Sequence, residues 1–281
     1  MRKRKIKKTI TIIAACFIIV GMLAATIVFG SYYYNQWNIN NTVNQIDERI
    51  SMAESTTSGN NPDNTQSSDD ENGEGGSSGN NNGNGNYDNG EVYYSYNYEN
   101  KKNNVDVNGL REASIKYNEA LKKTQSSKLV GEKSYSYAAL DLTKYGIYDN
   151  IYGYVSAPTI NMELPIYLGV TDNNMAYGAA HFCYTSLPTG GESTNVALAG
   201  HTGYIGRWLF DSIRYLEKGD NVSIKTYFGR LNYKVTSVKN KLPKESEDIF
   251  IEKGKDKLTL VTCIYDSKGT YKRCIVTCER S

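Results

Sequence analysis

One stretch of the chain, residues 51–100, cannot fold into a compact core, and it confines the folded domain to the residues that follow it. The stretch is rich in Asn, Gly, Ser and acidic residues, contains no Lys or Arg, and has almost no aliphatic side chains. Such a composition cannot bury enough apolar surface to offset the loss of conformational entropy on folding. We therefore expect a disordered tether, whose root-mean-square span for about fifty Gly-rich residues is about 40 Å.

The segment before the tether predicts a membrane anchor. Residues 1–8 are strongly basic, and residues 9–30 form an apolar run long enough to cross a bilayer core of about 30 Å as a helix. Three tyrosines at 32–34 and Trp37 follow, as in an interfacial aromatic belt. A cleaved signal peptide is the alternative, although its apolar region is normally about 7–15 residues long. We expect an uncleaved, single-pass anchor in the cell membrane, with the basic tip in the cytoplasm and the later domain outside it.

Between the anchor and the domain we place a juxtamembrane and disordered linker at 31–100, in which we expect at most a short helix at 38–50. The formal net charge is only +2, because the basic tip offsets the acidic linker, and no basic patch indicates a nucleic-acid partner. Five cysteines, one of them in the anchor, are too few for a disulfide-rich scaffold. The sequence has neither a C-x-x-C pair nor a histidine cluster for zinc, so we expect no metal site and no cofactor. An acidic loop at 239–257 is expected to be solvated rather than to bind calcium.

The domain begins with a helical pattern at 101–145, which places several apolar residues near one side of a helix: Leu110, Ile115, Tyr117 and Leu121. From residue 146 to residue 281 the sequence breaks into strand-like runs of four to eight residues, bounded by Gly, Pro and Asn. Seven or eight strands, with one helix predicted around Leu209, Ile213 and Leu216, indicate a mainly β, closed or nearly closed barrel. A parallel α/β fold is not expected, because helices do not alternate with the strands.

Cys263 is the strongest candidate for a reactive side chain. Alternation along "LTLVTC" puts Thr259, Val261 and Cys263 on one face, with the cysteine at the strand end. If the next strand pairs with this one across a tight turn, Arg273 comes close to Cys263 on the same face. A guanidinium there would favour the thiolate and donate hydrogen bonds to an oxyanion, as acyl transfer requires.

A reactive thiol also needs a proton partner, and the chain has two histidines. His201 is the first candidate, because "NVALAGHTGY" ends an apolar run at a flexible Gly-containing step, and His181 is the second. A lone cysteine or histidine is more often structural than reactive. Cys274 and Cys278 fit that structural interpretation, as small buried side chains.

The ordered set of motifs resembles the sortase family. "TLVTC" followed by "KRCIV" resembles the sortase signature T-L-x-T-C with a downstream Arg, and "ALAGHTGY" resembles the histidine segment of that family. The match covers roughly residues 152–281. The resemblance implies a sortase-like closed eight-stranded β-barrel with a few short helices. It also implies Cys263 as the nucleophile, His201 as the general acid/base, and Arg273 as the group that stabilises the oxyanion or positions the substrate.

The implied activity is that of a membrane-anchored cysteine transpeptidase, as found in Gram-positive bacteria. Sortases cut an L-P-x-T-G-like sorting signal after Thr, form a cysteine thioester, and pass the acyl protein to an amine. The implied partners are pilins or surface proteins, and the acceptor is a pilin lysine or a lipid-linked cell-wall precursor. Thr202 and Thr262 are implied as substrate-binding residues. Two alternatives stay open: a non-catalytic surface binding module, and a cysteine hydrolase that releases the peptide to water.

The subfamily is less defined. "YNEALKK" and "TSLPTGGEST" look most like class C, the pilin-polymerising sortases, in which residues 101–145 would supply a lid. However, the usual lid tripeptide Asp-Pro-Phe or Asp-Pro-Trp does not occur here, and Tyr265 stands where class C usually has Pro. A class A- or D-like anchoring enzyme is the alternative.

Overall fold

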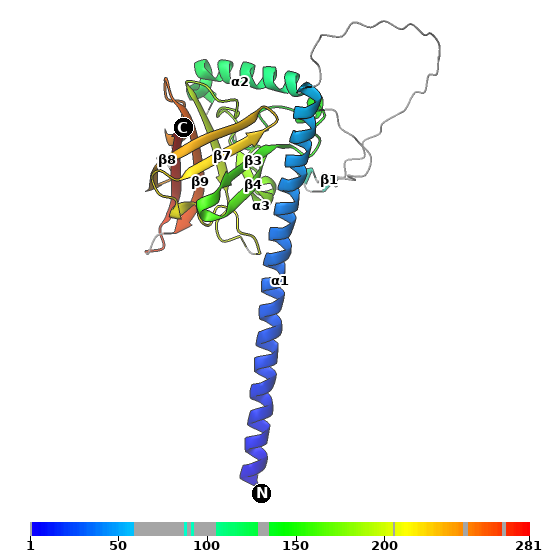
Figure 1. The fold of residues 1–281 in the computed structure, drawn as a ribbon. Coiled ribbons are helices and arrows are strands. Elements are labelled where there is room, and N and C mark those ends of the chain that lie inside the picture. The colour runs from blue at the N-terminus through cyan, green and yellow to red at the C-terminus, as the bar shows by residue number, and fades with distance from the viewer. Residues whose placement is uncertain are drawn as a thin grey trace, which may run out of the picture.

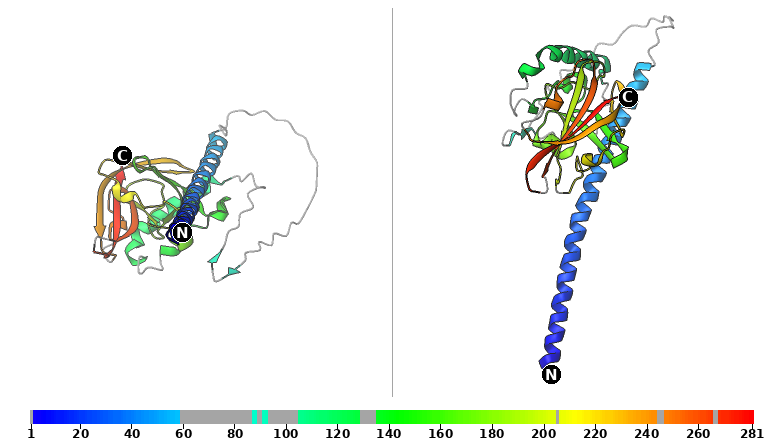
Figure 2. Two further views of the ribbon diagram at one scale, coloured as in Figure 1. Left: turned by 90° about the horizontal axis from the view of Figure 1, so that it is seen from below. Right: turned by 90° about the vertical axis from the view of Figure 1, so that its left-hand side faces the viewer.

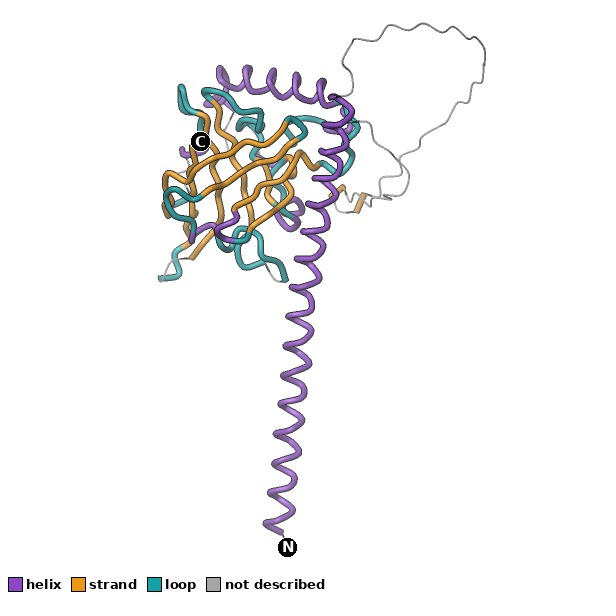
Figure 3. Tube along the Cα trace, viewed as in Figure 1, coloured by secondary structure: helices purple, strands orange, loops and turns teal. Residues whose placement is uncertain are grey.

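The computed structural model describes residues 2–58, 87–88, 91–92, 105–128, 135–204, 206–243, 247–265 and 268–281. Eight strands close into a barrel, which packs against helices α1 (Arg2–Ser58) and α2 (Val107–Lys128) (Figures 1 and 3). The barrel strands are β3 (Ile151–Ala157), β4 (Met162–Leu168), β5 (Ala179–His181), β6 (Thr194–Gly200), β7 (Asn221–Thr226), β8 (Gly229–Lys241), β9 (Asp256–Tyr265) and β10 (Tyr271–Arg280). The shorter elements are α3 (Asp172–Tyr177), the strands β1 (Tyr87–Asp88) and β2 (Glu91–Val92), and the 3₁₀ turns η2 (Leu142–Tyr145), η3 (Pro158–Ile160), η4 (Ile213–Tyr215) and η5 (Glu247–Ile249). The predicted closed, eight-stranded barrel is confirmed.

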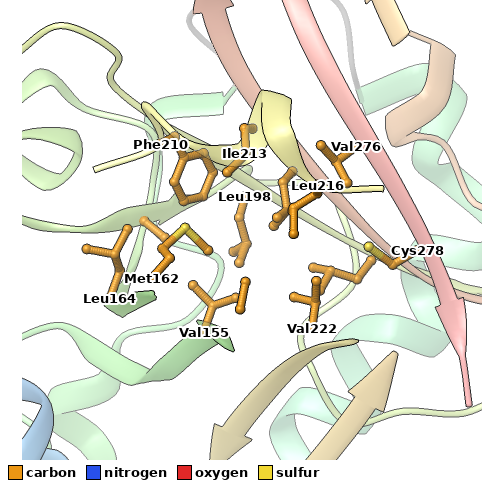
Figure 4. Packing of buried hydrophobic residues seen from close by; sticks show 14 of the residues in the cluster. Val155, Met162, Leu164, Leu198, Phe210, Ile213, Leu216, Val222, Val276 and Cys278 are labelled. Atoms are coloured by element: carbon orange, nitrogen blue, oxygen red, sulfur yellow. The ribbon is translucent and has the colours of Figure 1, made fainter. Parts of the chain in front are cut away.

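The strand order around the barrel is β10-β8-β7-β3-β4-β5-β6-β9, with β9 paired to β10 to close the ring. The pairs β4–β5 and β6–β9 are parallel, whereas the other pairs are antiparallel. Inward side chains from all around the ring fill one apolar core, where Leu198, Val222 and Val276 meet (Figure 4). Because β6 and β9 are parallel, both finish at the same end of the barrel, which we call the carboxyl edge.

The segment between β6 and β7 does not form the predicted helix. Leu209, Ile213 and Leu216, whose spacing suggested one, all belong to the barrel core, but the chain there is a loop with the short turn η4. Ile213 and Leu216 are seen among the core side chains in Figure 4. The carboxylate of Asp211 accepts hydrogen bonds from the backbone N–H groups of Gly203 and Leu209 at 2.7 and 3.0 Å. This side chain satisfies the backbone of a folded-back loop, which competes with helix formation.

Helix α1 continues well beyond residue 30, where we predicted the anchor to end. Ile39, Val43, Ile46 and Ile50 recur at intervals of four, three and four residues, and all four are buried within the hydrophobic clusters of the barrel and α2. This spacing produces one apolar helix face, and the helix is stabilised because the barrel covers that face. Residues 31–58 of the predicted linker are therefore helical, over a longer range than the short helix expected at 38–50. Most of the predicted tether, at 59–86, 89–90 and 93–100, lies outside the described residues, as do residues 101–104 of the predicted helical segment.

Charged side chains also fasten α1 to the barrel. The carboxylate of Asp47 accepts hydrogen bonds from Lys225 Nζ at 2.9 Å and from Tyr154 Oη at 2.8 Å. The hydrogen bond from Lys225 is the main cause that lowers the pKa of Asp47. Arg49 forms an ion pair with Asp149 at 2.7 Å. Polar and ionic contacts therefore hold this part of α1 against the barrel.

Helix α2 lies across the end of the barrel opposite the carboxyl edge, which we call the α2 end (Figure 1). Leu110 and Leu121 are buried as predicted and Tyr117 is partly buried, whereas Ile115 is 41% exposed. The helix accounts for 107–128 of the predicted helical segment. A lid role for 101–145 stays a prediction.

Two buried amide side chains join α2 to the loops of this end. Asn118 donates from Nδ2 to the Leu187 carbonyl at 2.9 Å and accepts from the Leu187 N–H at 2.8 Å. Gln125 donates to the Tyr184 carbonyl at 3.1 Å and accepts from the Ile251 N–H at 2.7 Å. Each amide thus pairs with both a backbone donor and a backbone acceptor.

Candidate active site

Strands β9 and β10 bring Cys263 and Arg273 together. The two residues are direct partners in the antiparallel register, so their side chains leave the sheet on the same face. Leu258, Leu260 and Ile264 point into the barrel core, while Cys263 is exposed on the outside. The expected pairing of Cys263 with Arg273 across the hairpin is therefore present.

The parallel pair β6–β9 adds His201 to this arrangement. Gly200, the last residue of β6, is the register partner of Thr262. His201, directly after β6, and Cys263 in β9 therefore follow side by side at the carboxyl edge. Neighbouring strands lie about 4.8 Å apart, which brings the two backbones within reach of one another's side chains. The ring of Phe210 sets this strand end, because a Cβ on Gly200 would lie only 2.5 Å from it. A glycine is needed there for the chain to approach the ring.

The loop that begins with His201 is held in place by several contacts. The imidazole stacks on the Tyr204 ring, with centroids 5.3 Å apart and planes 21° from parallel. The Phe210 N–H donates to the His201 carbonyl at 2.9 Å. Together with the Asp211 bonds described above, these contacts position the imidazole before any substrate binds.

The predicted substrate-binding residues Thr202 and Thr262 are in contact with each other. Their hydroxyl oxygens lie 2.6 Å apart, and the Thr262 hydroxyl donates to the Gly200 carbonyl at 2.7 Å. Thr262 is buried, whereas Thr202 is partly exposed. This geometry gives Thr262 a role in joining the ends of β6 and β9, and substrate binding by either threonine stays a prediction.

Tyr271 is a site residue that our sequence analysis missed. Its hydroxyl lies 2.7 Å from the sulfur of Cys263, and its ring packs edge-on against Tyr265. The hydrogen bond with Cys263, with burial second, raises the pKa of Tyr271 to about 12, so the phenol keeps its proton. The residue lies two positions before Arg273 on the same face of β10, so the alternation that identified Arg273 would also have identified it.

His181, our second candidate, lies in a different environment. It is fully buried, its Nε2 is 3.0 Å from the Ser186 carbonyl, and burial lowers its pKa to about 4. This histidine is therefore neutral at physiological pH and packed inside the protein. Cys274 and Cys278 are buried as predicted, and burial raises their pKa values to about 11 and about 12.

Two carboxylates of the acidic loop, Asp248 and Glu252, lie in ion pairs. Asp248 pairs with Lys241 at 2.6 Å, and Glu252 lies 3.3 Å from both Lys255 and Lys257. Within the described ranges, no group of three or more His, Cys, Asp or Glu side chains is arranged to hold a metal ion.

Comparisons with known proteins show which proteins this chain is similar to. The family model described as the Sortase domain matches residues 155–281. Sortase A of Bacillus anthracis is 33% identical over 126 residues, which cover 45% of this chain and 58% of that protein; the chain thus spans about half the length of the curated relatives it matches.

Two solved structures cover more of the domain. Sortase C1 of Streptococcus agalactiae, in its type II crystal structure, is 28% identical with a TM-score of 0.56, covering 63% of this chain and 90% of that one. Clostridium perfringens sortase C, solved with the C-terminal cell wall sorting motif, is 30% identical with a TM-score of 0.51, covering 65% of this chain and 92% of that one.

Proposed function

Since this chain belongs to the sortase family, with a likeness to class C, we propose that it is a membrane-anchored cysteine transpeptidase that cleaves an L-P-x-T-G-like sorting signal. One observation carries the proposal: the β9–β10 hairpin pairs Cys263 with Arg273, and the parallel β6–β9 pair brings His201, from a distant part of the sequence, to the same end of the barrel. Cys263 is exposed there, so a peptide can reach the sulfur.

In the proposed first step, the Cys263 thiolate attacks the carbonyl carbon of the Thr in the sorting signal. Arg273 donates hydrogen bonds to the oxyanion that develops, a contact that strengthens as the charge forms. The C–N bond to the following Gly then breaks, and His201 gives its proton to the leaving amine. The product is a thioester between the Thr carbonyl and Cys263.

In the second step, an acceptor amine attacks the thioester and loses a proton to His201, and the Cys263 thiolate leaves. The class C likeness favours a pilin lysine as the acceptor, and a lipid-linked cell-wall precursor is the other candidate. In a cysteine hydrolase, water would attack the thioester at this step with the help of the same residues. A non-catalytic binding module would carry out neither step.

Helix α1 supports the membrane part of the proposal. By length and composition, it contains a stretch apolar enough to cross a membrane. We place the basic tip in the cytoplasm and the barrel outside, because basic residues flank the apolar run on the amino-terminal side.

The test is intact-mass spectrometry of the full chain in detergent, incubated with an L-P-x-T-G peptide library. The full chain is used because residues 39–50 pack against the barrel, and a truncated domain would expose that surface. We expect an acyl adduct on Cys263 that disappears on addition of an amine and yields a ligated peptide. The Cys263→Ala variant should form no adduct and no product. Cleavage without ligation would favour the hydrolase, and a folded protein without any adduct would favour the binding module.

A further inference from the structure

The loop that carries His201 is docked on the outer end of the apolar run of α1. Tyr32 and Trp208 are in ring contact, with centroids 5.4 Å apart. Asn35 Nδ2 donates to the Gly206 carbonyl at 2.9 Å. Trp208 and Gly206 both belong to the loop after β6, so one short segment joins the candidate active site to the helix.

The backbone of this loop approaches α1 too closely for a side chain. Gly206 has φ of +80°, and a Cβ there would lie 3.0 Å from Asn35 Nδ2 and 3.4 Å from Ser31 Oγ. A residue with a side chain would be strained by the dihedral angle and would push the loop away from the helix. The glycine at position 206 thus allows the backbone of this loop to approach α1 closely.

Helix geometry gives the height of this contact above the membrane. The apolar run ends at residue 30, and at about 1.5 Å per residue Tyr32 is about 3 Å and Asn35 about 8 Å farther out. The headgroup layer on each side of a bilayer is about 5–8 Å thick. Trp208 therefore lies at headgroup level. Two views show the same orientation: the β9–β10 turn and the loop after β6 face the amino-terminal half of α1, and α2 lies at the far end (Figures 1 and 2).

The side chains at this height suit a lipid surface. Trp208 is 63% exposed, and Tyr33, Tyr34 and Trp37 are exposed around the same level of α1. Tryptophan and tyrosine favour the boundary between headgroups and acyl chains, because their rings are apolar and carry one polar group. Arg207, next to Trp208, packs its guanidinium on the Tyr177 ring and donates to the Ala176 carbonyl, and its positive charge favours anionic headgroups nearby.

We propose that the loop after β6 is a membrane-contacting loop, in which Trp208 enters the headgroup layer of the same bilayer that holds α1. The proposal rests on the membrane anchor proposed above. Its consequence is that the carboxyl edge, with Cys263, is held at the membrane surface. The enzyme would then act only on sorting signals that lie at the membrane surface. The acceptor amine would also have to reach the headgroup layer.

Tryptophan fluorescence tests the proposal directly, because the chain has only two tryptophans, Trp37 and Trp208. In the Trp37→Phe variant, Trp208 is the sole reporter. The full chain is reconstituted into vesicles of phosphatidylcholine and phosphatidylglycerol, with or without lipids that carry a spin label on the headgroup. We expect a blue-shifted emission that the label quenches by about two-fold or more.

The matched control moves the reporter to the α2 end. Ile115→Trp in a Trp37→Phe, Trp208→Phe background places an exposed indole on α2, and we expect the label to quench it little. Co-flotation with vesicles is measured for every variant. Vesicle-bound protein whose Trp208 is quenched no more than the control would overturn the inference and leave the anchor intact. Protein that does not co-float would contradict the anchor and, with it, the inference.

Activity gives a second readout. Trp208→Ser should leave the cleavage of a soluble peptide by the detergent-solubilised enzyme within about two-fold of wild type. In vesicles, cleavage of a lipid-tethered peptide should fall by about five-fold or more, because the site is no longer held at the surface. Equal rates for the two enzymes on the tethered peptide would contradict the positioning role.

Discussion

The two ends of the barrel are built in opposite ways. At the α2 end, Asn118 and Gln125 are buried and their amides pair with backbone groups. At the carboxyl edge, Cys263 is exposed and Arg273 is partly exposed. Buried polar groups are tolerated only when they are hydrogen-bonded, whereas a reactive group must reach its substrate. Strands β6 and β9 begin at the α2 end and finish at the carboxyl edge. The same two strands therefore keep the stabilising amides at one end of the barrel and the candidate reactive side chains at the other.

Among the substitutions that test this difference between the two ends, His201→Ala should have the largest effect on turnover. We expect His201→Ala to lower turnover by about 10³-fold, because it removes the group proposed to donate and accept the proton in the two steps. The melting temperature should change little, since His201 lies at the edge. The matched control is His181→Asn, which should lower the melting temperature and leave the turnover of the folded fraction intact. Near wild-type turnover in His201→Ala would remove His201 from the mechanism.

The next effect concerns Arg273. Arg273→Lys keeps the charge and loses the planar fork of donors, so we expect kcat to fall by about 10²-fold with little change in the urea midpoint. Lys272→Arg, one position earlier and on the other face of β10, serves as the control. Turnover close to wild type in Arg273→Lys would contradict the oxyanion assignment.

The buried histidine predicts a pH dependence of stability. Burial lowers the pKa of His181 to about 4, whereas an unfolded histidine has a pKa near about 6.5. Between these values the unfolded chain binds a proton that the folded chain does not. The free energy of unfolding therefore falls as the pH drops through this window, by about 3 kcal/mol in total. Urea titrations from pH 7 to pH 4 should show this slope in the wild type and a shallower slope in His181→Asn.

At the α2 end, we expect Asn118→Ala to lower the free energy of unfolding by about 2 kcal/mol, because it leaves the buried Leu187 N–H and carbonyl without their partner. Turnover per folded molecule should stay unchanged. Lys116→Ala, at an exposed position of the same helix, should change stability by less than about 0.5 kcal/mol. A loss of turnover with unchanged stability in Asn118→Ala would contradict the separation of the two ends.

The smallest effect is expected at Tyr271. Tyr271→Phe removes the hydroxyl 2.7 Å from the Cys263 sulfur and keeps the ring. We expect alkylation of Cys263 by iodoacetamide to slow by about three-fold at neutral pH, because the thiolate loses a hydrogen-bond donor. Tyr265→Phe, from the same turn, should alkylate at the wild-type rate. Identical rates for both variants would mean that the hydroxyl contact has no effect on the thiol.

Local patterns predicted the part of the site that depends on local pairing. Strand alternation and one short turn were enough to place Cys263 beside Arg273, because a hairpin fixes which side chains share a face. The same rule applies to Tyr271, so that omission was avoidable. His201 is different: its position beside Cys263 depends on a parallel pairing of β6 and β9, which no local pattern specifies. Only the family resemblance linked the two segments.

Tertiary context explains both the missing helix between β6 and β7 and the full extent of α1. Residues 209–216 have helical spacing because three apolar side chains enter one core, while Asp211 holds the backbone in a loop. Residues 39–50 have the spacing of an amphipathic helix, but that face gains its stability only from the barrel that covers it.

The parallel pairing of β6 and β9 also has a consequence for the order of events in folding. Thr202 and Thr262, which join these strand ends, are separated by 60 positions in the chain. Contacts between such distant segments form late, because the entropy of closing the loop must be lost before they contribute stability. The thiol of Cys263 thus meets its proposed proton partner only when the barrel is nearly complete. In a partly folded chain, Cys263 would lack its proposed proton partner and would react like an unactivated cysteine. It would become reactive only when the barrel is complete.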